Sequence, residues 1–252
     1  TTLKRPVLTT NVASVAVGFA LFGMSLIGPQ ILELPTETGF GLGQSMLQTG
    51  LWMAPGGLAM MISAPIAARM AAKRGPRFTL VAGALIIACA YLAGREMLDT
   101  PIQVMTFNIV ISVGVGFAFS SLPALINAAV PMSETAAANG INALARSLGT
   151  SVSSAVIGAV LTSMTITFAG QQLPSLAGFR TALLVAAAVA AIAAGVALMI
   201  PSAATAPVRE PVEWLENRDD PLDRRSYVLT PCGRERLSDD EPATAPNRVL
   251  RG

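Results

Sequence analysis

Long apolar runs separated by short polar stretches dominate the first 200 residues of the chain. A helix needs about 20 apolar residues to cross a hydrocarbon layer about 30 Å thick, because each residue adds about 1.5 Å. Six runs reach this length with very few charged side chains. They are residues 7–32, 46–68, 78–97, 103–128, 147–166 (with an alternative helix start near Glu134) and 178–200. The pattern predicts an all-α membrane protein with six transmembrane helices.

The pattern changes after residue 200. The chain carries 17 Lys and Arg and 15 Asp and Glu, and 18 of these 32 charged residues lie in residues 201–252. Residues 201–211 are rich in Ala and Pro, which is typical of a linker. We therefore expect two parts: a membrane body over residues 1–200 and a polar, largely flexible cytoplasmic tail over residues 201–252.

Lys and Arg favour the cytoplasmic side of short connections between spans. Alternate connections of this chain differ strongly in cation content. One set carries Lys4, Arg5, Arg69, Lys73, Arg74, Arg77 and Arg146, whereas the other carries Arg95 and Arg180. This asymmetry predicts a multi-pass protein of the plasma (inner) membrane with both termini in the cytoplasm.

The composition excludes several kinds of chemistry. The chain has no His and 2 Cys, so Ser-His-Asp catalysis, Cys-His catalysis and histidine metal sites are ruled out. The predicted spans hold no paired carboxylates. We expect no enzyme activity, no cofactor and no metal. A net charge of +2 is also too small to indicate a nucleic-acid partner.

Helix breakers interrupt two of the apolar runs. Pro55 and Gly56 lie in the middle of the second predicted span, and Pro123 lies in the fourth. Bends in lipid persist where neighbouring helices or water satisfy the freed carbonyl groups. These three residues are therefore candidates for helix bends, as expected of a protein whose helices move.

Small and polar residues recur at helical spacing on the fourth and fifth spans. In the fourth span they are Asn108, Ser112, Gly116, Ser120, Pro123 and Asn127, and in the fifth they are Ser147, Ser151, Ser154 and Gly158. Such a stripe indicates either close helix packing or the wall of a water-filled path. For the fifth span we favour packing. For the fourth span both interpretations stay open, and Asn108, Ser112, Ser120 and Asn127 are the substrate-cavity candidates.

A second face precedes the fifth apolar run. Asn139, Asn142 and Arg146 share it, because they follow one another at intervals of three and four residues. We expect Asn142 and Arg146 to lie at the cytoplasmic end, where the Arg146 side chain reaches the headgroups. A gating contact with a facing helix is the alternative.

Two stretches resemble a known family. They are LPTETGFGLGQSMLQTGLWMAPGGLAMMISAPIAARMAAKRGPRFTLVAGALI and SLPALINAAVPMSETAAANGINALARSLGTSVSSAVIGAVL. Both resemble the major facilitator superfamily, in its fourteen-span drug:proton antiporter branch. The resemblance covers about residues 1–200 and corresponds to the last six spans, the C-terminal half of the transporter fold. It implies export of drugs, including antibiotics, or other small amphipathic compounds by alternating access coupled to proton entry.

The same resemblance places a gating loop between the second and third spans. The family pattern there is roughly Gly-x-x-x-Asp-Arg-x-Gly-Arg-Arg. This chain keeps its second glycine as Gly75 and an arginine as Arg77, but it has Ala72 at the acidic position. We expect a weakened loop that is mainly structural. Its candidate residues are Arg69, Lys73, Gly75 and Arg77.

Proton coupling requires an ionisable group inside the membrane, usually a carboxylate. The predicted spans offer none, and in the family the acidic positions lie mostly in the N-terminal half. The expected partners are therefore the lipid bilayer, an N-terminal transporter half that binds the protons, and a small hydrophobic or amphipathic substrate. The alternatives are a truncated membrane protein without transport activity and a six-span half-transporter that must pair with a partner.

Residues 212–237 resemble the wing hairpin of MarR-type winged-helix regulators. Asp219 and Asp220 precede Pro221 in a turn, and Ser226 to Thr230 alternate like a strand. The recognition helix that such regulators place in the major groove has no counterpart upstream. We therefore expect a short hairpin with no function in nucleic-acid binding.

Overall fold

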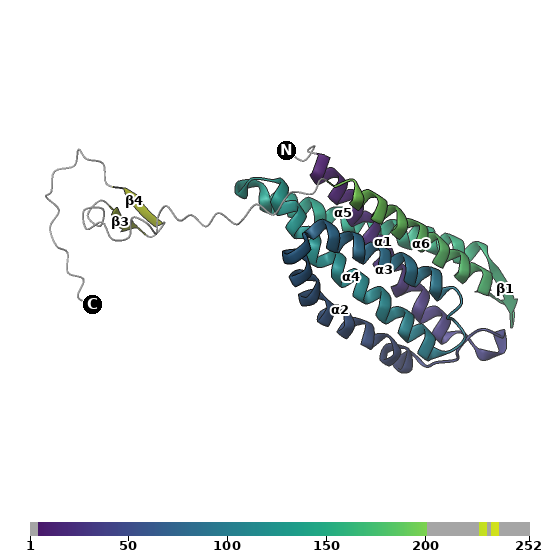
Figure 1. The fold of residues 1–252 in the computed structure, drawn as a ribbon. Helices are drawn as coiled ribbons and strands as arrows, with labels where there is room; N and C mark the ends of the chain where they lie inside the picture. The colour runs from purple at the N-terminus through teal and green to yellow at the C-terminus, as the bar shows by residue number, and fades with distance from the viewer. Residues whose placement is uncertain (1–4, 201–226, 231–232, 237–252) are drawn as a thin grey trace. The chain divides into compact units, whose positions relative to one another are not determined.

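The computed structural model describes residues 5–200, 227–230 and 233–236 (Figure 1). Six helices form its first unit. They are α1 (Arg5–Glu33), α2 (Met46–Arg74), α3 (Pro76–Gly94), α4 (Pro101–Ala129), α5 (Thr135–Ser163) and α6 (Leu176–Leu198). Each is long and apolar enough, by length and composition, to cross a membrane. The prediction of an all-α membrane protein with six spans is confirmed.

Short elements complete the described chain. The 3-10 helices η1 (Thr36–Thr38) and η2 (Met132–Glu134) lie in the connections before α2 and α5. Strands β1 (Thr165–Phe168) and β2 (Gln171–Pro174) pair antiparallel between α5 and α6. In the second unit, β3 (Tyr227–Thr230) pairs antiparallel with β4 (Gly233–Arg236). The rest of the predicted tail lies outside the described residues, and its winged-helix resemblance stays a prediction.

Helix boundaries follow capping signals more closely than hydropathy. Ser45 and Gln48 form a capping box at the start of α2, in which each side chain bonds the other residue's backbone N–H. At its other end α2 runs past Pro65 to Arg74. α5 begins at Thr135, so the earlier of its two predicted starts is correct. The apolar stretch marks the lipid-crossing part of each helix, whereas the helices themselves continue into the polar boundary.

The β1–β2 hairpin has no counterpart in the sequence-based prediction. Its two-residue turn, Ala169 and Gly170, has positive φ angles of 48° and 78°. This geometry matches the right-handed twist of paired strands, and glycine adopts it without strain. The alternating Thr165–Phe168 segment followed by Gly170 carried the signal. It was hidden because the preceding helix and the strand form one continuous apolar run.

α1 lies at the centre of the helical unit. It packs extensively against α5, α6 and α4, while α3 packs against α4 and α6. α2 packs chiefly along α4, and α5 chiefly along α1. Only 17% of the most apolar stretch of α2 and 28% of that of α5 is buried, against 61% for α1. α2 and α5 are therefore the two helices with most surface left for lipid or for another protein.

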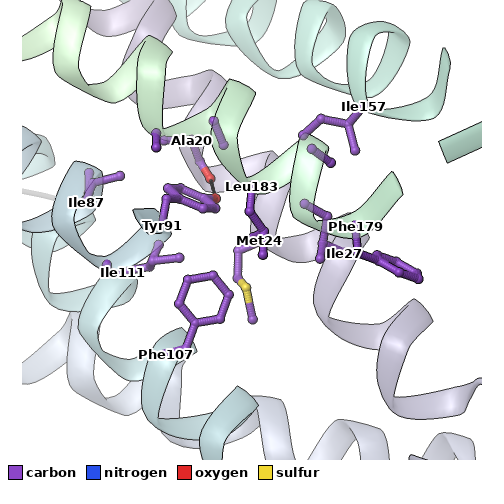
Figure 2. Close-up of a cluster of buried hydrophobic side chains, with 14 of the residues drawn as sticks. Ala20, Met24, Ile27, Ile87, Tyr91, Phe107, Ile111, Ile157, Phe179 and Leu183 are labelled. Atoms are coloured by element: carbon purple, nitrogen blue, oxygen red, sulfur yellow. Dashed lines mark hydrogen bonds between the residues drawn. The ribbon is translucent and has the colours of Figure 1, made fainter. Parts of the chain in front are cut away.

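A continuous apolar core joins α1, α3, α4 and α6. Tyr91 is fully buried at its centre, donates its hydroxyl to the Ala20 carbonyl of α1, and meets the Phe107 ring edge to face at 5.7 Å (Figure 2). A phenol inside a membrane protein needs such an acceptor, because an unpaired polar group costs free energy there. Tyr91 thereby joins three helices at one point.

Alternate helix ends gather at the two ends of the unit. Val7, Ile126 and Ala138 form one cluster, so the start of α1, the end of α4 and the start of α5 lie together. Arg77 donates to the Leu198 carbonyl, which adds the α2–α3 turn and the end of α6. At the opposite end, Glu96 approaches Arg95 at 3.4 Å and Arg180 at 3.6 Å. The two cations of that end thus share one carboxylate.

The α1–α5 crossing depends on glycine from both helices. A Cβ atom on Gly149 would lie 2.0 Å from the Val15 carbonyl oxygen, and one on Gly18 would lie 2.3 Å from the Arg146 carbonyl oxygen. Ser153 donates across the same crossing to the Phe19 carbonyl at 2.9 Å. Small residues let helix backbones approach closely in lipid, where packing rather than water exclusion stabilises the pair.

This crossing yields the first prediction. Gly149→Ala should destabilise the protein by about 1–3 kcal/mol, because α1 and α5 must separate to admit the methyl group. Gly158→Ala, on the same helix with no atom within 4 Å of its added Cβ, is the matched control and should change stability little. Thermal unfolding of the purified protein in detergent measures both. Equal stability of the two variants would contradict the tight crossing.

Candidate functional site

The two least covered helices of the unit are α2 and α5. Both helices expose large apolar side chains, including Leu51, Leu58, Leu144 and Leu148. α5 also exposes the small polar stripe Ser147, Ser151 and Ser154. Hydroxyl groups gain nothing from lipid contact, so this part of α5 differs from an ordinary lipid-facing surface.

The predicted stripe on α4 divides into two parts. Asn108 is buried and donates to the Met53 carbonyl of α2 at 3.0 Å. A Cβ atom on Gly56 would lie 2.9 Å from the Ser112 hydroxyl, and one on Gly116 would lie 2.2 Å from the Ser63 hydroxyl. Residues 108–116 of the stripe therefore pack against α2. Close packing accounts for these positions without a cavity.

The second part of the stripe lies beyond the α2 seam. Ser120 is half-buried and donates to the Phe117 carbonyl at 3.0 Å within its own helix. Asn127 is exposed and accepts from the Asn139 amide at 2.7 Å. Of the four substrate-cavity candidates, Asn127 is exposed and Ser112 and Ser120 are half-buried, whereas Asn108 is buried.

The stripe that packs α5 is not the one singled out in the sequence. α5 buries Ala138, Asn142, Ala145, Gly149, Ser153, Ile157 and Leu161. Ser147, Ser151 and Ser154 lie outside this stripe and are exposed, and an added Cβ on Gly158 meets nothing within 4 Å. The face for which we favoured packing is thus uncovered by the residues that the structure describes.

Asn142 lies in a buried polar cluster between α5 and α1. Its amide donates to Asn11 at 3.0 Å and to the Ser14 hydroxyl at 2.5 Å. Ser14 in turn donates to the Thr10 carbonyl at 2.9 Å. Asn142 therefore holds two helices together and does not face the headgroups.

Arg146 lies deeper than expected. Its Cγ would lie 3.1 Å from a Cβ added to Gly18, which is near the middle of α1. The guanidinium carbon is 4.9 Å from the centroid of the Phe119 ring on α4. Because α5 begins at Thr135, Arg146 is its twelfth residue rather than a residue that precedes the span. The structure places its side chain against the facing helix α4, as in the alternative of a contact with a facing helix, while its position relative to the headgroups stays a prediction.

The helix-bend candidates lie inside uninterrupted helices. α2 continues through Pro55 and Pro65, and α4 continues through Pro123. Gly56 also lies at a close approach of α2 and α4, because a Cβ there would lie 2.2 Å from the Asn108 amide nitrogen. The helix bends at these candidates stay a prediction.

The gating-loop candidates lie at the turn between α2 and α3. Gly75 has φ 91°, which favours glycine, and Pro76 begins α3. Arg77 caps the end of α6 through the Leu198 carbonyl, an arrangement that also suits the negative end of the α6 dipole. Arg69 and Lys73 are exposed. Away from the turn, α2 lies along α4 rather than α3.

Sequence reasoning missed two partners of these residues. They are Phe119, which contacts Arg146, and Asn11, which bonds to Asn142. No sequence pattern links either residue to its partner. The pairings depend on how α1, α4 and α5 are rotated, which a single sequence does not reveal. Within the described residues, no group of His, Cys, Asp and Glu could hold a metal ion.

The family model of the Major Facilitator Superfamily matches residues 13–231. The chain belongs to this superfamily. Its six apolar helices have the membrane-transporter fold of that superfamily.

Relatives and solved structures cover parts of longer proteins. Two Multidrug resistance protein B homologs, from two strains of Mycobacterium tuberculosis, are each 33% identical over 85 residues. That match covers 34% of this chain and 15% of each relative. The xylose transporter XylE of E. coli, in an inward open conformation, is similar in fold with a TM-score of 0.60 at 14% identity. It matches 77% of this chain and 47% of the transporter, so the chain spans about half the length of that fold.

The α2–α3 turn gives a second prediction. Gly75→Leu should strain the turn, and Arg77→Ala should leave the end of α6 without its guanidinium cap; each should lower the melting temperature in detergent by a few degrees. Lys73→Ala, which removes an exposed cation from the same loop, is the control and should leave the melting temperature unchanged. If Lys73→Ala lowers it as much as the other two, the contacts of Gly75 and Arg77 do not stabilise the turn.

Proposed function

We propose that this chain forms the C-terminal six-helix half of a proton-coupled exporter of drugs or other small amphipathic compounds. The observation that carries the proposal is the low burial of α2 and α5, with Ser147, Ser151 and Ser154 exposed on α5. A second six-helix half, packed against these two helices, would enclose a cavity bounded by these hydroxyls and by Ser120 and Asn127. The partial similarity to the multidrug resistance protein B homologs supports the export of drugs.

Proton coupling is assigned to the second half. The acidic residues of the described helical unit are Glu33, Glu37, Glu96, Asp99 and Glu134, and all lie at helix ends or in connections. A carboxylate that binds and releases protons during transport belongs inside the membrane. This half would then supply cavity wall and gate, and its partner would supply the protonation site.

Efflux from cells tests the proposal. The complete gene product, expressed in a drug-sensitive bacterial host, should lower the accumulation of amphipathic dyes several-fold, and a proton uncoupler should abolish this effect. Ser151→Phe should obstruct the cavity and reduce efflux, whereas Leu92→Phe, on an exposed part of α3, should not. Unchanged accumulation of a broad set of dyes and antibiotics would count against a drug exporter.

Orientation is tested by labelling. We propose that the end bearing Lys73 faces the cytoplasm of the plasma membrane and the end bearing Glu96 faces outward. In a background with Cys89→Ser and Cys232→Ser, a membrane-impermeant maleimide added to intact cells should label Glu96→Cys and spare Lys73→Cys. The reverse labelling would invert the proposed topology.

A further inference from the structure

Arg146 carries its charge far from either end of the helices. Phe119, over which its guanidinium lies, is ten residues before the end of α4, or about 15 Å at 1.5 Å per residue. The helices of this region have 29 residues each and a length of about 43 Å, so a central core of about 30 Å leaves about 6 Å outside at each end. With the helices centred on that core, the guanidinium lies about 9 Å inside the hydrocarbon level.

The charge has no counter-ion within the part of the chain that the structure describes. The ion pairs there join Arg95 and Arg180 to Glu96, at the other end of α3 and the start of α6. The Phe119 ring is the contact recorded for the Arg146 guanidinium. An ionised side chain at this depth is costly unless it is paired or faces water, and such side chains typically mark a substrate or ion pathway.

The surroundings are shaped to hold the side chain in this position. Its stem crosses α1 at Gly18, where any larger residue would collide with the Arg146 backbone and Cγ. The Phe119 ring lies on one side of the guanidinium, with its centroid 4.9 Å from the guanidinium carbon. The guanidinium N–H groups have no acceptor among the residues that the structure describes, so they stay available for a planar acceptor. A carboxylate fits such an edge with two parallel hydrogen bonds.

We propose that Arg146, held beside the Phe119 ring, is a subsite for the carboxylate of amphipathic organic acids. This inference rests on the proposed function and narrows it, because it makes anionic compounds substrates of the cavity that this half lines. The apolar body of the ligand would lie against the uncovered faces of α4 and α5.

Equilibrium binding with two matched probes tests the subsite. Radiolabelled 2-naphthoate carries the carboxylate, and 2-naphthalenemethanol has the same ring system without a charge. The purified complete gene product in detergent should bind the naphthoate at least about tenfold more tightly, as expected for a charge-assisted hydrogen-bonded pair. Arg146→Ala should remove this preference. Arg146→Lys should keep part of it, because it retains charge without the planar fork.

Arg95→Ala is the matched control: it removes one cation at the Glu96 end and should leave the preference unchanged. Arg146→Gln keeps a hydrogen-bonding side chain and replaces Arg146→Ala if that variant fails to fold. Equal binding of the two probes by the wild type would overturn the proposal, and so would a naphthoate preference that survives Arg146→Gln. If Arg146 formed an ion pair with an acid elsewhere in the complete protein, the wild type would bind the two probes equally.

The binding assay and the efflux assay fail separately. A wild type that prefers naphthoate but exports no compound would refute the exporter and retain the carboxylate subsite. A wild type that exports cationic dyes and binds both naphthalene probes equally would retain the exporter and refute the subsite. The subsite would also be refuted if Arg146→Ala exported dyes as well as the wild type does and the wild type bound both naphthalene probes equally.

Discussion

Within a bilayer, two helices gain little by hiding apolar surface from each other, because lipid tails are as apolar as leucine. What holds this unit together is close backbone approach at residues without bulk. Gly18 and Gly149 bring α1 and α5 together, and Gly56 admits the Asn108 amide to α2. Gly83 and Gly114 do the same for α3 and α4, where an added Cβ on each would lie within 3 Å of the other's carbonyl oxygen.

These seams fix the rotation of each helix, and rotation decides which side chains are left over. The face of α5 that carries Asn142, Gly149 and Ser153 packs against α1. Ser147 and Ser151 lie on another face and remain exposed. Asn108 faces α2 for the same reason. Helix packing therefore decides which surface a ligand can reach. Some polar residues that look like ligand-binding candidates in a helical projection are buried in contacts between helices.

The sequence was sufficient for the six helices, because an uncharged run of 20 or so residues has few alternatives to a membrane span. The rotation of each helix about its axis and the depth of individual side chains could not be predicted from the sequence. The stripe at Ser147 and the stripe at Asn142 are both small, polar and helically spaced, and it is the contacts with α1, at Gly149 and through Asn142 and Ser153, that distinguish them. Arg146 was predicted at the membrane surface since hydropathy alone starts the fifth apolar run at residue 147. The helix begins twelve residues earlier, at Thr135, which shifts the arginine inward.

The β1–β2 hairpin also limits how α5 can move. The segment between α5 and α6 forms an antiparallel hairpin from Thr165 to Pro174, so it cannot extend without breaking the hydrogen bonds between its strands. Ser175, which caps α6, is bonded through its N–H to the Met164 carbonyl just after α5, at 2.8 Å. Along their lengths α5 and α6 have little contact. If α5 changes position during a transport cycle, we expect it to rotate about this short connection. Its displacement would then be largest at the end that holds Asn139 and Asn142.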